Sequence, residues 1–436
     1  MDINAIIENK IVVREGKEEA VSKVQTYDPR FSAINKMKKS GKNSSTILQD
    51  NRNLILQLIQ KAGTISRKQL SEKTGLQPAT VTIIIQELLA QGIIKEYGMA
   101  DGGSGRGVKT FALVEDLYTV IVRLTAVYIK IALFNAHIKL LYVEKIFFEK
   151  DDYITEAVDL IDEHINKMKN IIDIGKILCI VIGVEHMYRL IDSDYKIWDE
   201  YRQEYCPIGK IVHGRTGFEV YVNRAINIST YEVWDRFKQL KHWDDDYIMM
   251  INIQLSYDLE GTVIINNELI YGANGLCGQL KNLRANPDSE KTLNDLITVP
   301  ALLRRTNELI KEYPDSYIAQ KEKVNIRDVI AGYGMGDQLC KQIYNEVISY
   351  IGYPLAQMLE LLDPNVILIA DEVPEIEEFV EALQVEVAKY TEIEKAKRVG
   401  TLMTERLTKN DPTLTGGAKY AFELMFGDIG FFDKRN

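Results

Sequence analysis

The chain has 436 residues, of which 46% are hydrophobic and 27% are charged, and its formal net charge is −10. This length predicts about two to four domains, and this composition is typical of a soluble globular protein. Because no apolar run is long enough to span a membrane and the acidic N-terminus does not resemble a secretory signal, we expect a cytoplasmic protein. The four cysteines are far apart, which favours buried free thiols over disulfides or a zinc site.

The charge is distributed unevenly along the chain. Residues 31–110 hold 12 of the 53 Lys and Arg residues but only 5 of the 63 Asp and Glu residues, a net charge of +7. The rest of the chain carries 41 basic and 58 acidic residues, a net charge of −17. A basic module on an acidic body is expected of a DNA-reading domain joined to a regulatory domain, although a solvated basic face has the same composition.

Residues 1–45 are predicted to form an N-terminal arm. Four lysines between residues 36 and 42 lead into a stretch rich in Gly, Asn and Ser. Such lysines suit an arm that contacts phosphates and equally a solvated linker.

Three helices are predicted after the arm. Apolar residues recur at helical spacing in the first, which Gly63 ends. Ser66 and Gln69 match a capping box at the start of the second, and Gly75 suits a tight turn after it. Pro78 is well placed at the first position of the third helix. The third helix has an apolar stripe made of Val81, Ile84, Ile85 and Leu88. This order predicts a helix-turn-helix.

A wing is predicted after the third helix and completes a domain over residues 46–115. It consists of a strand (92–98), a glycine-rich tip (102–107) and a return strand (109–113). Arg106 at the tip is expected to enter a narrow minor groove of DNA. A phosphate-cradling loop is the alternative, but no convincing helix follows the glycines.

The predicted partner of this head is double-stranded operator DNA. Short or polar side chains that lie off the apolar stripe of the third helix are expected to approach base edges and phosphates, namely Gln77, Ala79, Thr80, Thr82 and Gln86. The candidate phosphate contacts are the basic residues Arg52, Arg67 and Lys68. A head that docks a protein partner is the alternative, and a steep loss of affinity with salt distinguishes DNA from it.

The remainder of the chain has an α/β pattern. It combines an amphipathic helix over 153–172 with strands predicted over 119–134, 139–148, 177–183, 247–255, 261–265 and 365–370. We expect two lobes, 116–240 and 241–436, with their boundary near residues 234–246.

This order of elements resembles the ROK family (repressors, open reading frames and sugar kinases), and most closely its transcriptional-repressor branch. In the head the resemblance rests on 51–52, 66–70, 74–76, 80–81, 87–89 and 104–106. In the body it rests on 222–223, 266–272, 362–364 and 416–418. It implies a winged helix-turn-helix followed by a two-lobed, actin-like body of the sugar-kinase type. It also implies a repressor of carbohydrate genes, a homodimer or higher homo-oligomer, and a sugar or sugar derivative as effector.

The body departs from the family at its phosphate loops. Arg123-Leu124-Thr125 replaces the Asp-x-Gly pattern of the first loop, and Thr125 adds a side chain where a phosphate needs the backbone close by. In the second loop, Asp258 and Glu260 would repel a triphosphate. These departures from the family pattern predict that the body binds no nucleotide.

The sugar and zinc positions of the family also differ. Arg224 replaces the Asp that serves as the base, and a guanidinium stays protonated. Gln279 and Asn282 replace the sugar-gripping Glu and the His after it, and residues 285–297 contain no Cys or His. We expect no catalysis, no cofactor and no metal. The rival prediction, a sugar kinase with an appended DNA-binding head, requires a carboxylate base near Asn223.

Two hypotheses for the cleft remain open. Asn223, Arg224, Gln279 and Asn282 are candidate effector-binding residues, because amide groups can hydrogen-bond a neutral sugar or polyol. Alternatively, the cleft is collapsed and serves only dimerisation. Arg123, Arg224 and Lys281 would suit an anion if they converge, but could equally form internal salt bridges.

Overall fold

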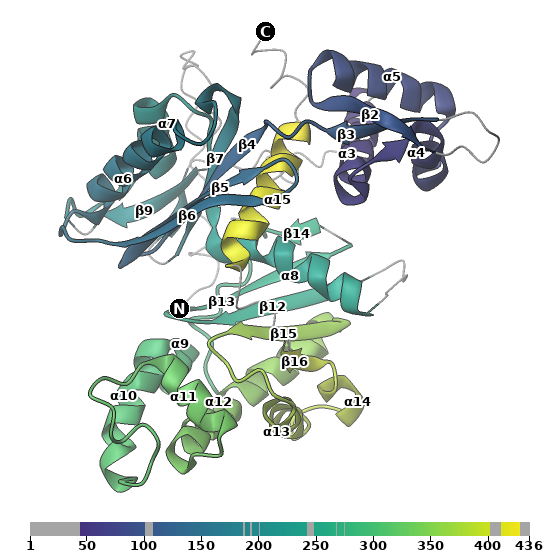
Figure 1. Ribbon diagram of the computed structural model, residues 1–436. Helices are drawn as coiled ribbons and strands as arrows, with labels where there is room; N and C mark the ends of the chain where they lie inside the picture. Colours follow the sequence, from purple (N-terminus) through teal and green to yellow (C-terminus); the bar gives the residue numbers. More distant parts are fainter. Residues whose placement is uncertain are drawn as a thin grey trace, which may run out of the picture.

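A computed structural model of the protein describes residues 44–100, 108–185, 188–191, 194–199, 201–241, 248–266, 268–273, 275–401 and 411–427 (Figure 1). The predicted arm and the wing tip with Arg106 lie outside these residues. Within them, no helix is both long and apolar enough to cross a membrane.

The head has three helices and a small antiparallel sheet with strand order β1-β3-β2. Its elements are α3 (Ser44–Ala62), β1 (Ile65–Ser66), α4 (Arg67–Thr74), α5 (Pro78–Ala90), β2 (Ile94–Ala100) and β3 (Val108–Leu113). The Ser66–Gln69 capping box is present, and Gly75 ends α4 with a φ of 69°. The predicted apolar stripe of α5 is fully buried. The predicted winged helix-turn-helix is thus confirmed.

Lobe 1 contains a five-stranded sheet of order β11-β7-β4-β5-β6. Its strands are β4 (Tyr118–Leu124), β5 (Tyr128–Asn135), β6 (Leu140–Phe147), β7 (Ile177–Val184) and β11 (Val220–Arg224). All eight residues of β7 are buried, because it lies between parallel neighbours in a sheet covered on both faces. The stretch predicted as one strand over 119–134 is in fact the β4–β5 hairpin, which turns at Thr125.

Helices cover both faces of this sheet. One face packs on α6 (Tyr153–Met168) and α7 (Ile208–Thr216), and the other packs on α8 (Ala225–Lys241) and α15 (Pro412–Gly427). The short helix η1 (Ile174–Lys176) precedes β7. A small separate sheet consists of β8 (Tyr188–Ile191), β9 (Asp194–Asp199) and β10 (Glu204–Cys206).

Lobe 2 contains a second five-stranded sheet, of order β14-β13-β12-β15-β16. Its strands are β12 (Met249–Leu255), β13 (Leu259–Ile265), β14 (Glu268–Ile270), β15 (Val366–Asp371) and β16 (Val399–Thr401). One face is covered by α9 (Leu293–Ile297), α10 (Val299–Leu309), η2 (Ile310–Glu312), α11 (Ile326–Gly334), α12 (Gln338–Leu362), α13 (Glu377–Val387) and α14 (Ile393–Ala396). Trp234 and Phe237 of α8 pack on the other face, so α8 contacts both sheets at the predicted lobe boundary.

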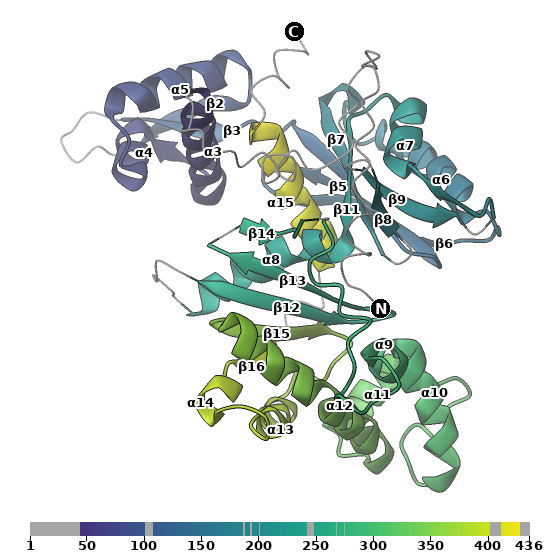
Figure 2. The ribbon, with the colours of Figure 1, turned by 180° about the vertical axis from the view of Figure 1, so that it is seen from behind.

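The last helix, α15, joins lobe 1 to the head. It packs on α8, β4 and β7 of lobe 1 and on α3 of the head, and one continuous apolar core runs through these elements (Figures 1 and 2). Gly416 and Gly417 permit this packing, because an added Cβ would lie 2.2 Å from the Ile228 carbonyl oxygen or 2.5 Å from the Ile121 side chain. The chain therefore returns to lobe 1 at its last helix, whereas the sequence assigned all of 241–436 to lobe 2.

Candidate DNA-binding face and interlobe cleft

Four of the residues predicted to read DNA lie on one side of α5, and the fifth, Gln77, is the N-cap residue just before the helix. Gln77, Ala79 and Gln86 are exposed, whereas Thr80 and Thr82 are half-buried. Thr82 donates its hydroxyl hydrogen to the Pro78 carbonyl 2.8 Å away, within the helix. The four residues within the helix lie off the buried stripe, as the helical period requires. The head contacts the body through α3, which packs on α15 (Figure 1).

The sequence reasoning missed the residue at the middle of this face. Ile83 has 54% of its surface exposed, although it belongs to a run of three isoleucines of which the other two are buried. It follows Ala79 by four residues and precedes Ala90 by seven, so these three side chains share the outward face. Their spacing is the signal that identifies Ile83. The one charged residue of α5 is Glu87.

One predicted phosphate contact is wrong. Arg52 is only 1% exposed, and its guanidinium donates a hydrogen bond to Gln91 at the end of α5. A buried side chain that links α3 to α5 in this way cannot reach a phosphate. Arg52 therefore belongs to the interior of the head.

The other two basic residues lie at the start of α4. The Arg67 guanidinium lies 4.6 Å from the centre of the Phe111 ring, a cation–π contact that orients it. The Lys68 side chain is 81% exposed and lies 3.8 Å from Glu72. Both stay candidate phosphate contacts.

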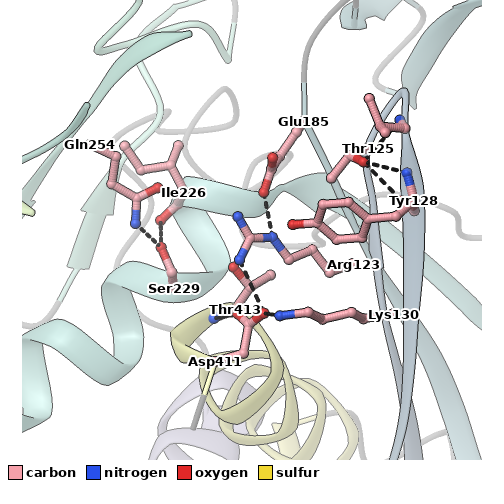
Figure 3. A network of polar contacts seen from close by, with 11 residues as sticks. Arg123, Thr125, Tyr128, Lys130, Glu185, Ile226, Ser229, Gln254, Asp411 and Thr413 are labelled. Carbon is pink, nitrogen blue, oxygen red and sulfur yellow. Dashed lines mark hydrogen bonds and ion pairs between the residues drawn. The ribbon is translucent and has the colours of Figure 1, made fainter. Parts of the chain in front are cut away.

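In lobe 1, Arg123 forms an internal ion-pair network at the family's first phosphate loop (Figure 3). Its Nε lies 2.5 Å from Glu185 Oε1, and its Nη1 lies 3.0 Å from Asp411 Oδ2. Lys130 Nζ lies 2.6 Å from the same Asp411 oxygen. Burial would raise the pKa of Asp411, but Arg123 and Lys130 more than offset this and hold that pKa at about 2.

Asp411 is also the residue that starts α15. Its Oδ1 accepts a hydrogen bond from the Thr413 backbone N–H at 3.0 Å. The N-terminus of a helix attracts anions, and phosphates commonly bind there. Here the protein's own carboxylate supplies the negative charge.

Thr125 closes the hairpin where the family has glycine. Its hydroxyl oxygen accepts the backbone N–H groups of Val127 and Tyr128 at 3.1 and 2.9 Å. The same hydroxyl donates to the Tyr128 carbonyl at 2.9 Å. The Thr125 side chain thus stabilises this turn through three hydrogen bonds.

A small, acidic cavity lies between the lobes. It has a volume of about 20 Å³, which is enough for roughly one water molecule. The lining residues are Glu185, Ile226, Gln254, Ser256, Asp258, Glu260 and Asp371.

None of the four predicted effector residues is among the residues that line this cavity. Asn223 is fully buried, and its Oδ1 accepts hydrogen bonds at 2.8 Å from the Arg224 backbone and from Asn227. Arg224 is 1% exposed; it donates to the Cys277 carbonyl at 2.6 Å and lies 3.5 Å from Glu260. Gln279 is half-buried and Asn282 is exposed.

Two of the three cations proposed for an anion site pair with different carboxylates. Arg123 pairs with Glu185 and Asp411, whereas Arg224 pairs with Glu260. Internal salt bridges, the alternative left open by the sequence, therefore account for both arginines. Among the described residues, no group of three or more His, Cys, Asp or Glu side chains could hold a metal ion.

Comparison with known families agrees with this architecture. Residues 119–422 match the ROK family, and residues 48–95 match a winged helix-turn-helix DNA-binding domain. The chain belongs to the ROK family. Its head is a DNA-binding domain, and its body has the sugar-kinase-type fold that the sequence predicted.

Several relatives of this ROK protein are regulators. The xylose repressor of Caldicellulosiruptor bescii is 24% identical over 349 residues, which cover 76% of this chain and 84% of the repressor. The transcriptional dual regulator NagC of Escherichia coli is 22% identical over 359 residues, which cover 76% and 83%. A ROK family transcriptional regulator described as a homologue of the E. coli MLC protein has a crystal structure that matches with a TM-score of 0.72. That match has 19% identity and covers 89% of this chain and 99% of the other.

Proposed function

We propose that this ROK protein is a transcriptional repressor of carbohydrate genes whose body is not an enzyme. One observation carries the proposal: the head exposes its recognition helix, while the kinase positions of the body are filled by the protein's own ion pairs. The regulators among its relatives support the same function.

The proposed binding mode places α5 in the major groove of operator DNA. Gln77, Thr80 and Gln86 would approach base edges, and Arg67 and Lys68 would hold neighbouring phosphates. Arg106, outside the described residues, would probe the minor groove beside them. A homodimer of the body would present two heads to two half-sites.

The effector is proposed to be a sugar or sugar derivative that binds when the lobes separate. The cavity of about 20 Å³ between the lobes supports this requirement, because it is smaller than a sugar. Gln279 and Asn282 are then the reachable amides. A ligand that binds only the open form shifts the population toward it. The contact of α15 with α3 would pass this change to the head.

The lost kinase chemistry is proposed on electrostatic grounds. A sugar kinase needs a carboxylate base and an open phosphate site, whereas Arg224 and the Arg123–Asp411 pair occupy those positions. A coupled assay of ADP release across common hexoses is expected to stay at the background rate. Turnover that depends on one hexose would contradict this part of the proposal.

DNA binding is tested by a gel-shift titration with the DNA upstream of the protein's own gene. We expect a specific shift that survives competitor DNA and weakens as salt rises, because binding releases counterions from the phosphates. If that DNA gives no specific shift, selection from a random duplex library follows. No enrichment in that selection would overturn the repressor proposal.

A further inference from the structure

The outward face of α5 carries an apolar side chain at its centre. Ile83 is 54% exposed, between Ala79 and Ala90 on the same face. This surface of hydrocarbon lies where a helix-turn-helix meets base edges.

The charges of α5 restrict which base edges it can read. Its 13 residues contain no Lys or Arg, and Arg or Lys to guanine is the commonest specific contact in the major groove. The thymine C5 methyl is the one apolar group that bases present in that groove. The thymine methyl is therefore the group on the DNA that an exposed isoleucine is best suited to contact.

The stiffness of the side chain supports this pairing. A β-branched residue in a helix has one strongly preferred χ1 rotamer, so Ile83 presents its methyl groups in a fixed direction. Little conformational entropy is lost when such a side chain is buried, compared with a long flexible one. The neighbouring Thr82 is also ordered, by its hydrogen bond to Pro78.

We infer that Ile83 determines specificity by contacting a thymine methyl group in each operator half-site. The inference rests on the proposed binding of DNA by the head. Burial of one methyl group between protein and base contributes about fourfold in affinity. Replacement of the thymine by uracil removes this methyl and leaves the hydrogen-bonding edge unchanged.

The test is a double-mutant cycle between protein and DNA. The full-length protein first selects its site from a random duplex library. Each thymine of the selected duplex is then replaced in turn by deoxyuridine, and Kd is measured by fluorescence anisotropy for wild type and Ile83→Ala. We expect wild type to lose about fourfold at one thymine per half-site. Ile83→Ala should bind the thymine duplex more weakly and be indifferent to deoxyuridine at that position.

The control is Ile393→Ala, the same substitution at a 64% exposed position of α14 in lobe 2, which should respond to deoxyuridine as wild type does. The inference is overturned if no deoxyuridine weakens wild type, or if Ile83→Ala retains the full penalty. Those results leave DNA binding itself intact. A wild-type protein that selects no sequence would instead overturn the proposed function, and this inference with it.

Discussion

Polar side chains are exposed on the DNA-binding face of the head, whereas charged side chains in the interlobe cleft are paired with one another. On α5, Gln77 and Gln86 are exposed and available to a partner. In the cleft, the charged groups of Arg123, Arg224 and Asp411 are paired within the protein. A binding surface needs groups whose hydrogen bonds are still available, whereas charged groups that are already paired have little to offer a nucleotide. The comparison explains how a kinase-type fold can serve a regulator.

The largest effect is expected from restoring a carboxylate in the cleft. Arg224→Asp would place a negative charge beside Glu260 and remove the hydrogen bond to the Cys277 carbonyl. Losing a buried charge pair in this way should cost about 3 kcal/mol of stability. We expect a lower midpoint of thermal unfolding and no ADP release with any hexose. A stable Arg224→Asp variant that phosphorylates a sugar would break the comparison, because the cleft would then be one substitution from catalysis.

A charge on the outward face of α5 should have the next largest effect. Ala79→Glu would oppose the negative potential of the major groove, so operator affinity should fall by at least about a hundredfold, or about 3 kcal/mol. Ala79 is exposed, so the unfolding midpoint should not change. Kd from fluorescence anisotropy measures the effect, with Ile393→Glu in lobe 2 as the matched control. Equal affinity of both variants would mean that α5 does not face the DNA.

A smaller, pH-dependent effect is expected at the start of α15. Asp411→Asn keeps a capping side chain but removes the charge that Arg123 and Lys130 share, and should cost about 2 kcal/mol at pH 7. Because the folded pKa of Asp411, about 2, lies below its ordinary value of 3.8, its contribution is complete above pH 4. That contribution is lost as pH falls from about 4 toward 2.

Denaturant unfolding of wild type and Asp411→Asn at a series of pH values measures this difference. The two stabilities should converge as the pH falls. The control is Glu360→Gln, which removes a more exposed ion pair with Lys395 and should cost much less stability, because solvent screens exposed ion pairs. A constant difference from pH 7 to pH 2 would contradict the network.

The smallest effect is expected at a phosphate contact. Lys68→Ala should weaken binding a few-fold to specific and nonspecific DNA alike, and reduce the salt dependence of log Kd by about one unit of slope. Anisotropy titrations at several salt concentrations measure both, with the remote exposed lysine Lys397→Ala as control. A selective loss for one sequence would identify Lys68 as a base reader instead.

The helix-turn-helix of the head could be predicted from local sequence signals. The Ser66 capping box, the Gly75 turn and the Pro78 start each depend on neighbouring residues, and all three are present. The prediction that Arg52 contacts phosphate was wrong because nothing in its local sequence reveals its hydrogen bond to Gln91, 39 residues away.

In the body, too, contacts between residues far apart in the chain could not be predicted from the sequence. Arg123 and Thr125 were enough to predict that the first phosphate loop departs from the family pattern. Asp411 lies 288 residues from Arg123, so its ion pair with Arg123 could not be predicted. The return of α15 to lobe 1 likewise depends on contacts between segments far apart in the chain. Ile83 was missed because an isoleucine inside an apolar run is more often buried.

The central claim is that α5 on a ROK body reads DNA. Selection from a random duplex library with full-length wild type and with Ala79→Glu tests it most directly. The account predicts that wild type enriches a motif with two related half-sites and that Ala79→Glu enriches none. Enrichment of the same motif by both proteins would contradict the account, because the outward face of α5 would then play no part in recognition.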